Sequence, residues 1–418
     1  MMTIVQIFSA ILLLSVMSAS WTGTSAATEE QGGKEAQKEL REFSVVYNDR
    51  ALNAMSSSFV DVVKELHDML TDCYQAKRAV VMPGSGTFAM EALARQVADK
   101  QDVLVIRNGY FSYRWTDIFE QGFIVKDSTV LRAEWTTKNG FPIFSPLSIE
   151  KLVAQIKDRK PAVVFAPHVE TSTGMMLPDE HIKAIGEAAR AVNGTFVLDG
   201  IAAGMHWVDM KENLVDYYIT APQKGWSGLA GAGIVMMGDR GYDVVSNTVS
   251  SSMALNLKNW RDVMETYLND GYKYYTTLPT DVIKFFHDSA AEIRDALGWE
   301  ESKRRFVDLG RRVRIMMESK GLVSVTAKEY AAPGVIVMYT DNDTIVADLK
   351  GHGIQAAAGV PFMLGESLPY KTFRIGLFGL EKVYDVHGTT KILEDALDAI
   401  LGDRDVEFIS EDSSSPEL

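Results

Sequence analysis

Between residues 79 and 240 the chain alternates short, continuously apolar runs with segments of helical periodicity. The apolar runs are 79–82, 103–106, 162–166, 195–198, 217–220 and 233–237, and the helical segments include 88–100, 113–121 and 178–192. Strands that are apolar along their whole length are typical of a mostly parallel sheet covered by helices on both faces. The pattern therefore predicts an α/β fold, and such sheets bind ligands at the carboxyl ends of their strands.

The second half of the chain has a different pattern. Residues 258–320 have mainly helical periodicity, whereas 322–400 combine β-like runs at 334–339 and 372–375 with a last helix over 381–401. We therefore expect a large domain over residues 43–280 and a smaller carboxyl-terminal α+β domain over 281–402.

The two ends of the chain differ from this body. Residues 4–17 are almost entirely apolar and small residues follow at 25–27, which is typical of a signal peptide. The apolar run is shorter than the ~20 residues that a membrane-spanning helix needs. We expect a signal peptide over 1–27 and a linker over 28–42, with secretory, periplasmic or endomembrane entry, and a cytoplasmic protein if the leader is not used. The acidic, serine-containing residues 403–418 predict a disordered tail.

Composition excludes several classes of protein. The net charge is −14 and the chain has no basic run, so nucleic-acid binding is not expected. The single cysteine, Cys73, allows neither an internal disulfide nor a cysteine zinc cluster, and none of the 7 histidines stands at metal-ligand spacing. We expect no metal site, no stable membrane insertion, and a buried or neutral thiol at Cys73.

A glycine-containing segment, residues 83–87, follows the first strand and opens a helix. Glycines let the backbone approach an anion, and the amino end of a helix supplies free N–H groups and the positive end of its dipole. Ser85 and Thr87 flank Gly86 and add two hydroxyl groups. The spacing matches neither a P-loop nor a dinucleotide-binding motif. The segment predicts a phosphate-binding turn, although the same turn could serve only to join strand and helix.

Two ionisable residues follow later strands. Asp199 ends the apolar run 195–198, and Lys224 follows the next run among small and apolar residues. A partly desolvated lysine has a lowered pKa and can form a Schiff base. Each residue alone is more often structural, but together with a phosphate-binding turn they indicate pyridoxal 5′-phosphate. This cofactor needs a lysine for its aldehyde, an acid for its ring nitrogen and a cradle for its phosphate.

Six motifs follow one another along the chain, at residues 84–87, 108–115, 168–174, 197–199, 223–224 and 373–376. Their order resembles the class V aminotransferases, and within them the alanine–glyoxylate, serine–glyoxylate and 2-aminoethylphosphonate branch. The resemblance covers roughly residues 43–400. It implies the fold type I of pyridoxal-phosphate-dependent transferases, with a mostly parallel seven-stranded sheet in the large domain.

The resemblance also implies a role for each motif residue. Lys224 would form the Schiff base and move the substrate proton, and Asp199 would pair with the ring nitrogen. Arg374 would bind the substrate carboxylate, a task suited to its planar two-donor group. The other cofactor-binding residues it implies are Ser85, Gly86, Thr87 and Gln223 at the phosphate, Phe111 stacked on the ring, and Thr171 beside the ring's 3-hydroxyl group.

The segment 274–279 is similar to one that reaches the phosphate of the neighbouring subunit in this family. The matching positions are Tyr274 and Thr277. The resemblance therefore implies a homodimer whose active sites are shared between subunits, and in which the first segment of the 43–280 domain contributes to the dimer contact.

Two stretches depart from the family pattern, the loops at 225–231 and 355–361, and both are expected to border the substrate pocket. The leading interpretation is a ping-pong transaminase that moves an amino group from alanine or serine to glyoxylate or pyruvate. A lyase or a 2-aminoethylphosphonate-type transaminase on the same fold is the alternative. A desulfurase is disfavoured because it needs a mobile cysteine near the lysine, and the retained motifs argue against a non-catalytic binding protein.

Overall fold

The computed structural model describes residues 41–367 and 369–402. The residues from Glu42 onward belong to one compact unit. The expected signal peptide, nearly all of the expected linker and the expected acidic tail lie outside the described residues, so all three stay predictions.

The core of the unit is a seven-stranded sheet in the order β1-β11-β10-β9-β6-β2-β3. Strands β10, β9, β6, β2 and β3 are parallel to one another, and β11 runs antiparallel to both β1 and β10. The α/β fold with a mostly parallel sheet is therefore confirmed. The strands are β1 (Arg78–Pro83), β2 (Asp102–Arg107), β3 (Asp127–Arg132), β6 (Val163–Pro167), β9 (Thr195–Asp199), β10 (Tyr217–Thr220) and β11 (Ala232–Met237).

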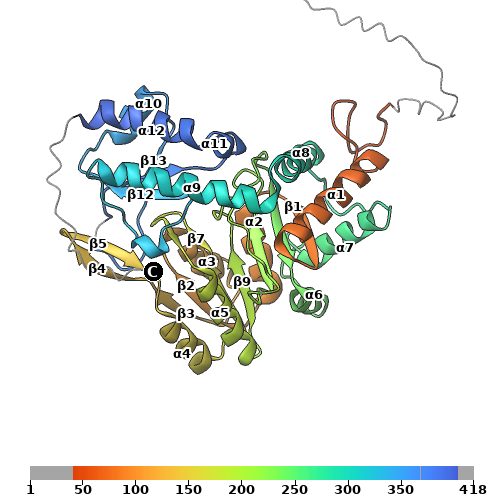
Figure 1. The fold of residues 1–418 in the computed structure, drawn as a ribbon. Helices are drawn as coiled ribbons and strands as arrows, with labels where there is room; N and C mark the ends of the chain where they lie inside the picture. The colour runs from red at the N-terminus through yellow and green to blue at the C-terminus, as the bar shows by residue number, and fades with distance from the viewer. Residues whose placement is uncertain (1–40, 368, 403–418) are drawn as a thin grey trace, which may run out of the picture. The chain divides into compact units, whose positions relative to one another are not determined.

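Helices pack against this sheet at each crossover (Figure 1). Helix α3 contacts β2 and β6, α5 contacts β9, and α2 contacts β10 and β11, while α1 and α7 cover β1. The central strands β6, β9, β10 and β11 are fully buried, which explains their continuously apolar sequences. These helices, with α4 and α6, are α1 (Ser57–Tyr74), α2 (Gly86–Val97), α3 (Tyr110–Gly122), α4 (Ile149–Arg159), α5 (Asp179–Ala191), α6 (Asp239–Ser246) and α7 (Leu257–Leu268).

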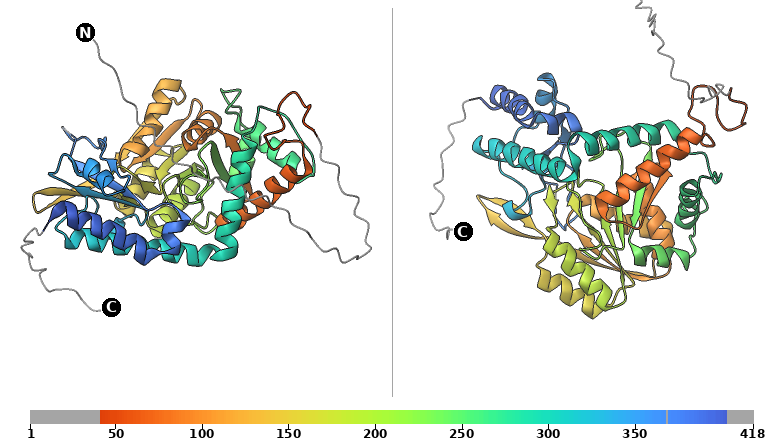
Figure 2. Two further views of the ribbon diagram at one scale, coloured as in Figure 1. Left: turned by 90° about the horizontal axis from the view of Figure 1, so that it is seen from above. Right: turned by 45° about the vertical axis from the view of Figure 1, so that its right-hand side comes forward.

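A second, three-stranded sheet of order β12-β14-β13 lies with α9, α10 and α12, and the blue and cyan elements gather together in both figures (Figures 1 and 2). It has its own buried apolar cluster, which includes Leu309, Ile336 and Phe373. Because the residues from Glu42 onward form one compact unit, the division at residue 280 stays a prediction. The elements are α8 (Thr280–Ala296), α9 (Gly298–Ser319), η1 (Lys328–Tyr330), β12 (Val335–Tyr339), α10 (Ile345–Gly351), β13 (Ala357–Ala358), β14 (Thr372–Gly376), α11 (Leu380–Tyr384) and α12 (Val386–Leu401).

Some elements were not expected from the sequence. The edge strand β3 is only partly buried and β4 (Glu134–Lys138) is exposed, so neither has a continuous apolar run. Strand β5 (Phe141–Ser145), which forms a hairpin with β4, is mostly partly buried, and its short apolar run contains Pro142. The short hairpin of β7 (Val169–Glu170) and β8 (Met175–Met176) was also missed. The last helix is interrupted at Asp385, whose side chain caps the new helix α12. Within the described residues, no helix combines the length and the apolar character that crossing a membrane requires.

Candidate active site

A cavity of about 560 Å³ lies where the carboxyl ends of the large sheet face the small sheet. Its walls come from the loops after β1, β2, β6, β9 and β10 and from β12 and β14. This is the edge at which an α/β sheet is expected to hold its ligand. The sequence-predicted residues that line it are Ser85, Gly86, Thr87, Phe111, Thr171, Asp199, Gln223, Lys224 and Arg374.

The turn between β1 and α2 needs glycine at positions 84 and 86. A Cβ atom added to Gly86 would lie 2.5 Å from Cδ1 of Ile201, and Gly84 has a φ of +119°, which favours glycine. Ser85 precedes the helix in an extended conformation, and its hydroxyl makes no capping bond to the helix. The first N–H groups of α2 and the hydroxyls of Ser85 and Thr87 can therefore bind an anion in the cavity.

Asp199 is buried at the end of β9 and lines the cavity. One carboxylate oxygen, Oδ1, accepts a hydrogen bond from the backbone N–H of Ile201 at 3.1 Å. Burial raises the pKa of Asp199 to about 7, while the nearby Arg114 lowers it. A buried carboxylate of this kind is costly unless it gains a cationic partner. A protonated ring nitrogen would supply that partner.

Lys224 follows β10 and projects into the same cavity. Burial, and after it the charges of Arg374 and Arg114, lowers the pKa of Lys224. Its Nζ lies 4.9 Å from the ring centroid of Phe378. Desolvation and two neighbouring cations favour the neutral amine, which is the form that attacks a carbonyl group.

Phe111 is held by a buried carboxylate at the amino end of α3. Glu170 is fully buried, and its Oε1 accepts a hydrogen bond from the backbone N–H of Phe111 at 3.1 Å. The same carboxyl group accepts the backbone N–H groups of Ser112 at 2.8 Å and Ser172 at 3.0 Å. Phe111 therefore has a fixed backbone position at the cavity wall, as a stacking platform requires.

Arg374 extends from β14 into the cavity from the side of the small sheet. Its Nε donates a hydrogen bond to the carbonyl oxygen of Ala358 at 3.0 Å. Burial lowers the pKa of Arg374 from its ordinary value, and Glu170 raises it. With Nε held in this way, the terminal Nη groups can meet a carboxylate, since a guanidinium group offers five donors in a plane.

Other residues of the wall were not singled out from the sequence. Arg114 lies one helical turn after Phe111 on α3, so helical spacing could have placed it on the same side of the helix and beside the cavity. No comparable spacing in the sequence points to Phe378. The loop at 355–361 borders the cavity as expected, through residues 355–357, but none of the residues 225–231 lines it. Trp226 is fully buried packing.

Tyr274 and Thr277 do not line this cavity. Both side chains are exposed, and the Tyr274 hydroxyl lies 3.5 Å from Oγ1 of Thr277. Cys73 is also remote from the cavity, and burial raises the pKa of its thiol well above the ordinary value. Cys73 is buried, as expected from the sequence.

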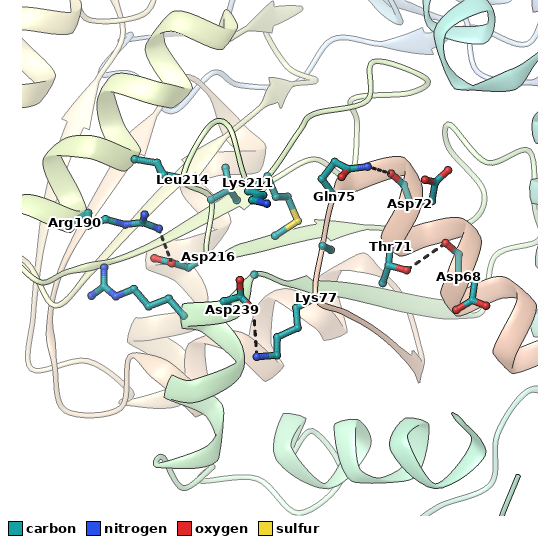
Figure 3. A pocket seen from close by; sticks show the side chains of 15 residues that line it. Asp68, Thr71, Asp72, Gln75, Lys77, Arg190, Lys211, Leu214, Asp216 and Asp239 are labelled. Atoms are coloured by element: carbon teal, nitrogen blue, oxygen red, sulfur yellow. Dashed lines mark hydrogen bonds and ion pairs between the residues drawn. The ribbon is translucent and has the colours of Figure 1, made fainter. Parts of the chain in front are cut away.

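A larger hollow of about 1120 Å³ lies near the opposite edge of the sheet (Figure 3). Charged side chains of both signs line it, and they pair with one another. Lys77 lies 3.2 Å from Asp239, and Arg190 lies 3.9 Å from Asp216. None of the residues predicted to act chemically lies there, so the smaller cavity is the candidate active site.

The residues of the candidate site fit pyridoxal phosphate. The anion-binding turn, the buried Asp199 and the desolvated Lys224 correspond to its phosphate, its ring nitrogen and its aldehyde. Among the described residues, no group of histidine, cysteine and carboxylate side chains could hold a metal ion.

Comparisons with known proteins agree with this geometry. The sequence model of the class-V aminotransferase family matches residues 24–261. A 2-aminoethylphosphonate–pyruvate transaminase of Lysinibacillus sphaericus is 27% identical over 318 residues, which are 76% of this chain and 82% of that protein. The (S)-ureidoglycine–glyoxylate transaminase of Bacillus subtilis is 32% identical over 214 residues, 48% of each chain. Alanine–glyoxylate aminotransferase 1 of Saccharomyces cerevisiae is 25% identical over 344 residues, covering 78% of this chain and 84% of that protein.

Solved structures show the same fold. A ureidoglycine–glyoxylate aminotransferase of Bacillus subtilis superimposes with a TM-score of 0.69 at 24% identity, over 83% of this chain and 87% of that one. An alanine–glyoxylate aminotransferase of Nostoc sp. superimposes with a TM-score of 0.70 at 21% identity, over 83% and 89% of the two chains.

Proposed function

Because the chain belongs to the class-V aminotransferase family, we propose that it moves the amino group of a small amino acid, such as alanine or serine, to glyoxylate or pyruvate. The chain is a transaminase that uses pyridoxal phosphate, as its family and its relatives indicate. The observation that carries the substrate proposal is that Lys224, Asp199 and Arg374 meet in one cavity of about 560 Å³.

Each of these side chains has a task that its surroundings support. When bound, the cofactor supplies an electron sink for the bond-breaking step. Asp199 would hold the proton on the ring nitrogen, because a buried carboxylate gains most from a cation. Lys224, whose pKa is lowered by burial, would take and return the proton at the substrate α-carbon through its Nζ. The same groups serve both halves of a ping-pong reaction.

The cavity wall limits the size of the substrate. Arg374 would bind its carboxylate, and the neighbouring wall is made of Ala356, Ala357, Val335 and Phe378. These small and apolar side chains leave room for a short substrate side chain and offer it no charge. The names of the three relatives agree on the acceptor, since each is pyruvate or glyoxylate. The comparisons give no support to a lyase.

The test is a donor and acceptor panel on the purified protein loaded with cofactor. We expect alanine or serine with glyoxylate or pyruvate to give stoichiometric amounts of a new amino acid and a new 2-oxo acid. In Lys224→Ala, turnover and the adduct fixed by borohydride reduction should both be lost, whereas exposed Lys183→Ala is the matched control and should keep both. Turnover with 2-aminoethylphosphonate alone would refute the proposed donor.

We propose that the protein works as a homodimer with shared active sites. Apolar and aromatic side chains in and near the segment 274–279 are exposed in the single chain. Their exposed fractions are 83% for Val249, 67% for Met253 and 56% for Tyr274. The hydroxyl of Tyr275 donates to the carbonyl of Met253, which ties this segment to its neighbour. Light scattering should give twice the chain mass. Thr277→Ala should weaken cofactor binding, although Thr277 lies outside the cavity of its own chain. A protein that is monomeric and fully active would refute the dimer.

We also propose that residues 1–27 direct export and are removed. The support is the apolar run at 4–17 followed by small residues. Amino-terminal sequencing of protein from its native host should find a start near residue 27 or 28. An intact Met1 would refute this proposal.

A further inference from the structure

The guanidinium group of Arg114 lies inside the candidate active site without an assigned task. Arg114 is half-buried on α3 and lines the cavity together with Ser85, Gly86 and Thr87. Its Nη1 donates a hydrogen bond to Oγ1 of Thr87 at 3.3 Å. Thr87 belongs to the first turn of α2, whose free N–H groups form the anion-binding turn. Arg114 is thus attached to the phosphate side of the cavity.

The second arginine of the cavity is attached to the opposite wall. Arg374 bonds to Ala358 of the small sheet, and its Cζ lies 5.8 Å from the ring centroid of Phe111. Arg114 lies nearer to the same ring, with its Cζ at 4.8 Å. The two guanidinium groups therefore flank one aromatic ring but are held by different parts of the chain. This separation suits two different anions, one on each side.

The charge in the anion-binding turn is otherwise small. A phosphate monoester carries roughly −1.5 to −2 at neutral pH, and a helix end offers about half a positive charge. Ser85 and Thr87 are neutral, Lys224 is committed to the cofactor aldehyde, and Arg374 faces the substrate. The Glu170 carboxylate accepts hydrogen bonds from backbone N–H groups and serine hydroxyls. Within the described residues, the hydrogen-bond partner of the Arg114 guanidinium is Thr87.

We propose that Arg114 binds the phosphate group of the cofactor and neutralises part of its charge. This proposal rests on the proposed function, because it assumes that pyridoxal phosphate occupies the cavity. In this role the guanidinium donates to a phosphate oxygen beside Thr87, and it holds the phosphate in the subunit that carries the anion-binding turn. Any contribution from Tyr274 and Thr277 of a second copy would be additional.

The experiment compares two ligands that differ only in the phosphate. Binding of pyridoxal 5′-phosphate and of pyridoxal to the cofactor-free protein is measured by equilibrium dialysis, in wild type, Arg114→Gln, Arg114→Lys and Arg374→Gln. Losing a charge-assisted hydrogen bond should raise the Kd of pyridoxal 5′-phosphate about ten- to one-hundredfold in Arg114→Gln. The Kd of pyridoxal should change by less than about threefold, and Arg114→Lys should recover part of the loss.

Arg374→Gln is the matched control, since it removes the other guanidinium group beside the same ring. We expect it to leave the ratio of the two Kd values unchanged. An equal loss for both ligands in Arg114→Gln would show that Arg114 only supports the structure, and an unchanged Kd for pyridoxal 5′-phosphate would also overturn the proposal. Wild-type protein that binds neither ligand would instead count against the proposed function, so the two failures are distinguishable.

Discussion

Replacing Asp199 by asparagine should change how the stability of the cofactor-free protein depends on pH. Burial raises the pKa of Asp199 from 3.8 to about 7. Between these values the folded chain keeps the carboxyl proton and the unfolded chain loses it, so the free energy of unfolding falls as pH rises. A difference of about three pKa units lowers the free energy of unfolding by roughly 4 kcal/mol above pH 7, and it leaves that free energy unchanged below about pH 4. Asparagine cannot ionise, so the variant should lack this loss of stability.

Chemical denaturation of both proteins at pH 4 to 8, at one protein concentration, measures the effect. We expect the variant to gain stability relative to wild type across this range, by about 3 to 4 kcal/mol in total. Added cofactor should reduce the pH dependence of wild type, because a protonated ring nitrogen stabilises the carboxylate. The same slope in wild type and variant would refute the reasoning.

Asp216→Asn provides the control. Asp216 is also buried with a raised pKa, it accepts the backbone N–H of Phe196 at 2.9 Å, and it lines the hollow of Figure 3 rather than the active site. Its substitution should also alter the pH dependence. Cofactor should leave that contribution of Asp216 unchanged.

Three further predictions concern single side chains. Glu170→Gln replaces one accepting oxygen by an amide that cannot accept the N–H of Ser112, and should cost about 1 to 3 kcal/mol by chemical denaturation; unchanged stability would contradict this. Gly225→Ala would place a Cβ 2.0 Å from the carbonyl oxygen of Gly204, and should lower the thermal midpoint by several degrees in calorimetry; an unchanged midpoint would contradict this. Arg374→Lys should raise the KM of the 2-oxo acid about tenfold in steady-state kinetics while the cofactor still binds; a change in kcat alone would argue against a carboxylate contact.

Much of the large sheet could be predicted because its central strands are buried on both faces. A continuous apolar run such as 195–198 followed by one carboxylate is a local signal, and Asp199 and Lys224 stand at strand ends that the sequence marks clearly. The anion-binding turn is equally local, since Ser85, Gly86 and Thr87 are consecutive. Such features need no knowledge of the rest of the fold.

What could not be predicted depends on contacts between distant segments. Phe378 faces Lys224 only because the segment after β14 returns to the large sheet. The hydrogen bonds that Glu170 accepts from the backbone N–H groups of Phe111 and Ser112 form only when its loop meets α3. The strand β3 is partly buried and β4 is exposed, so their sequences carry no continuous apolar run. The break at Asp385 is a capping interaction within a periodicity that continues across it.

The position of β1 has a consequence for synthesis of the chain. In the large sheet, β1 is an edge strand and pairs with β11, with Arg78 opposite Met237. Strand β1 therefore cannot form its sheet hydrogen bonds until β11 has been synthesised. The ribosome therefore releases the anion-binding turn long before the strand that fixes it, and Arg374 emerges later still. Pairing over such a distance in sequence is slow because a long loop must close first. We therefore expect the cofactor to bind late in the synthesis and folding of each chain. A nascent chain that ends before residue 232 lacks β11, the strand with which β1 pairs, and so cannot form the phosphate side of the site.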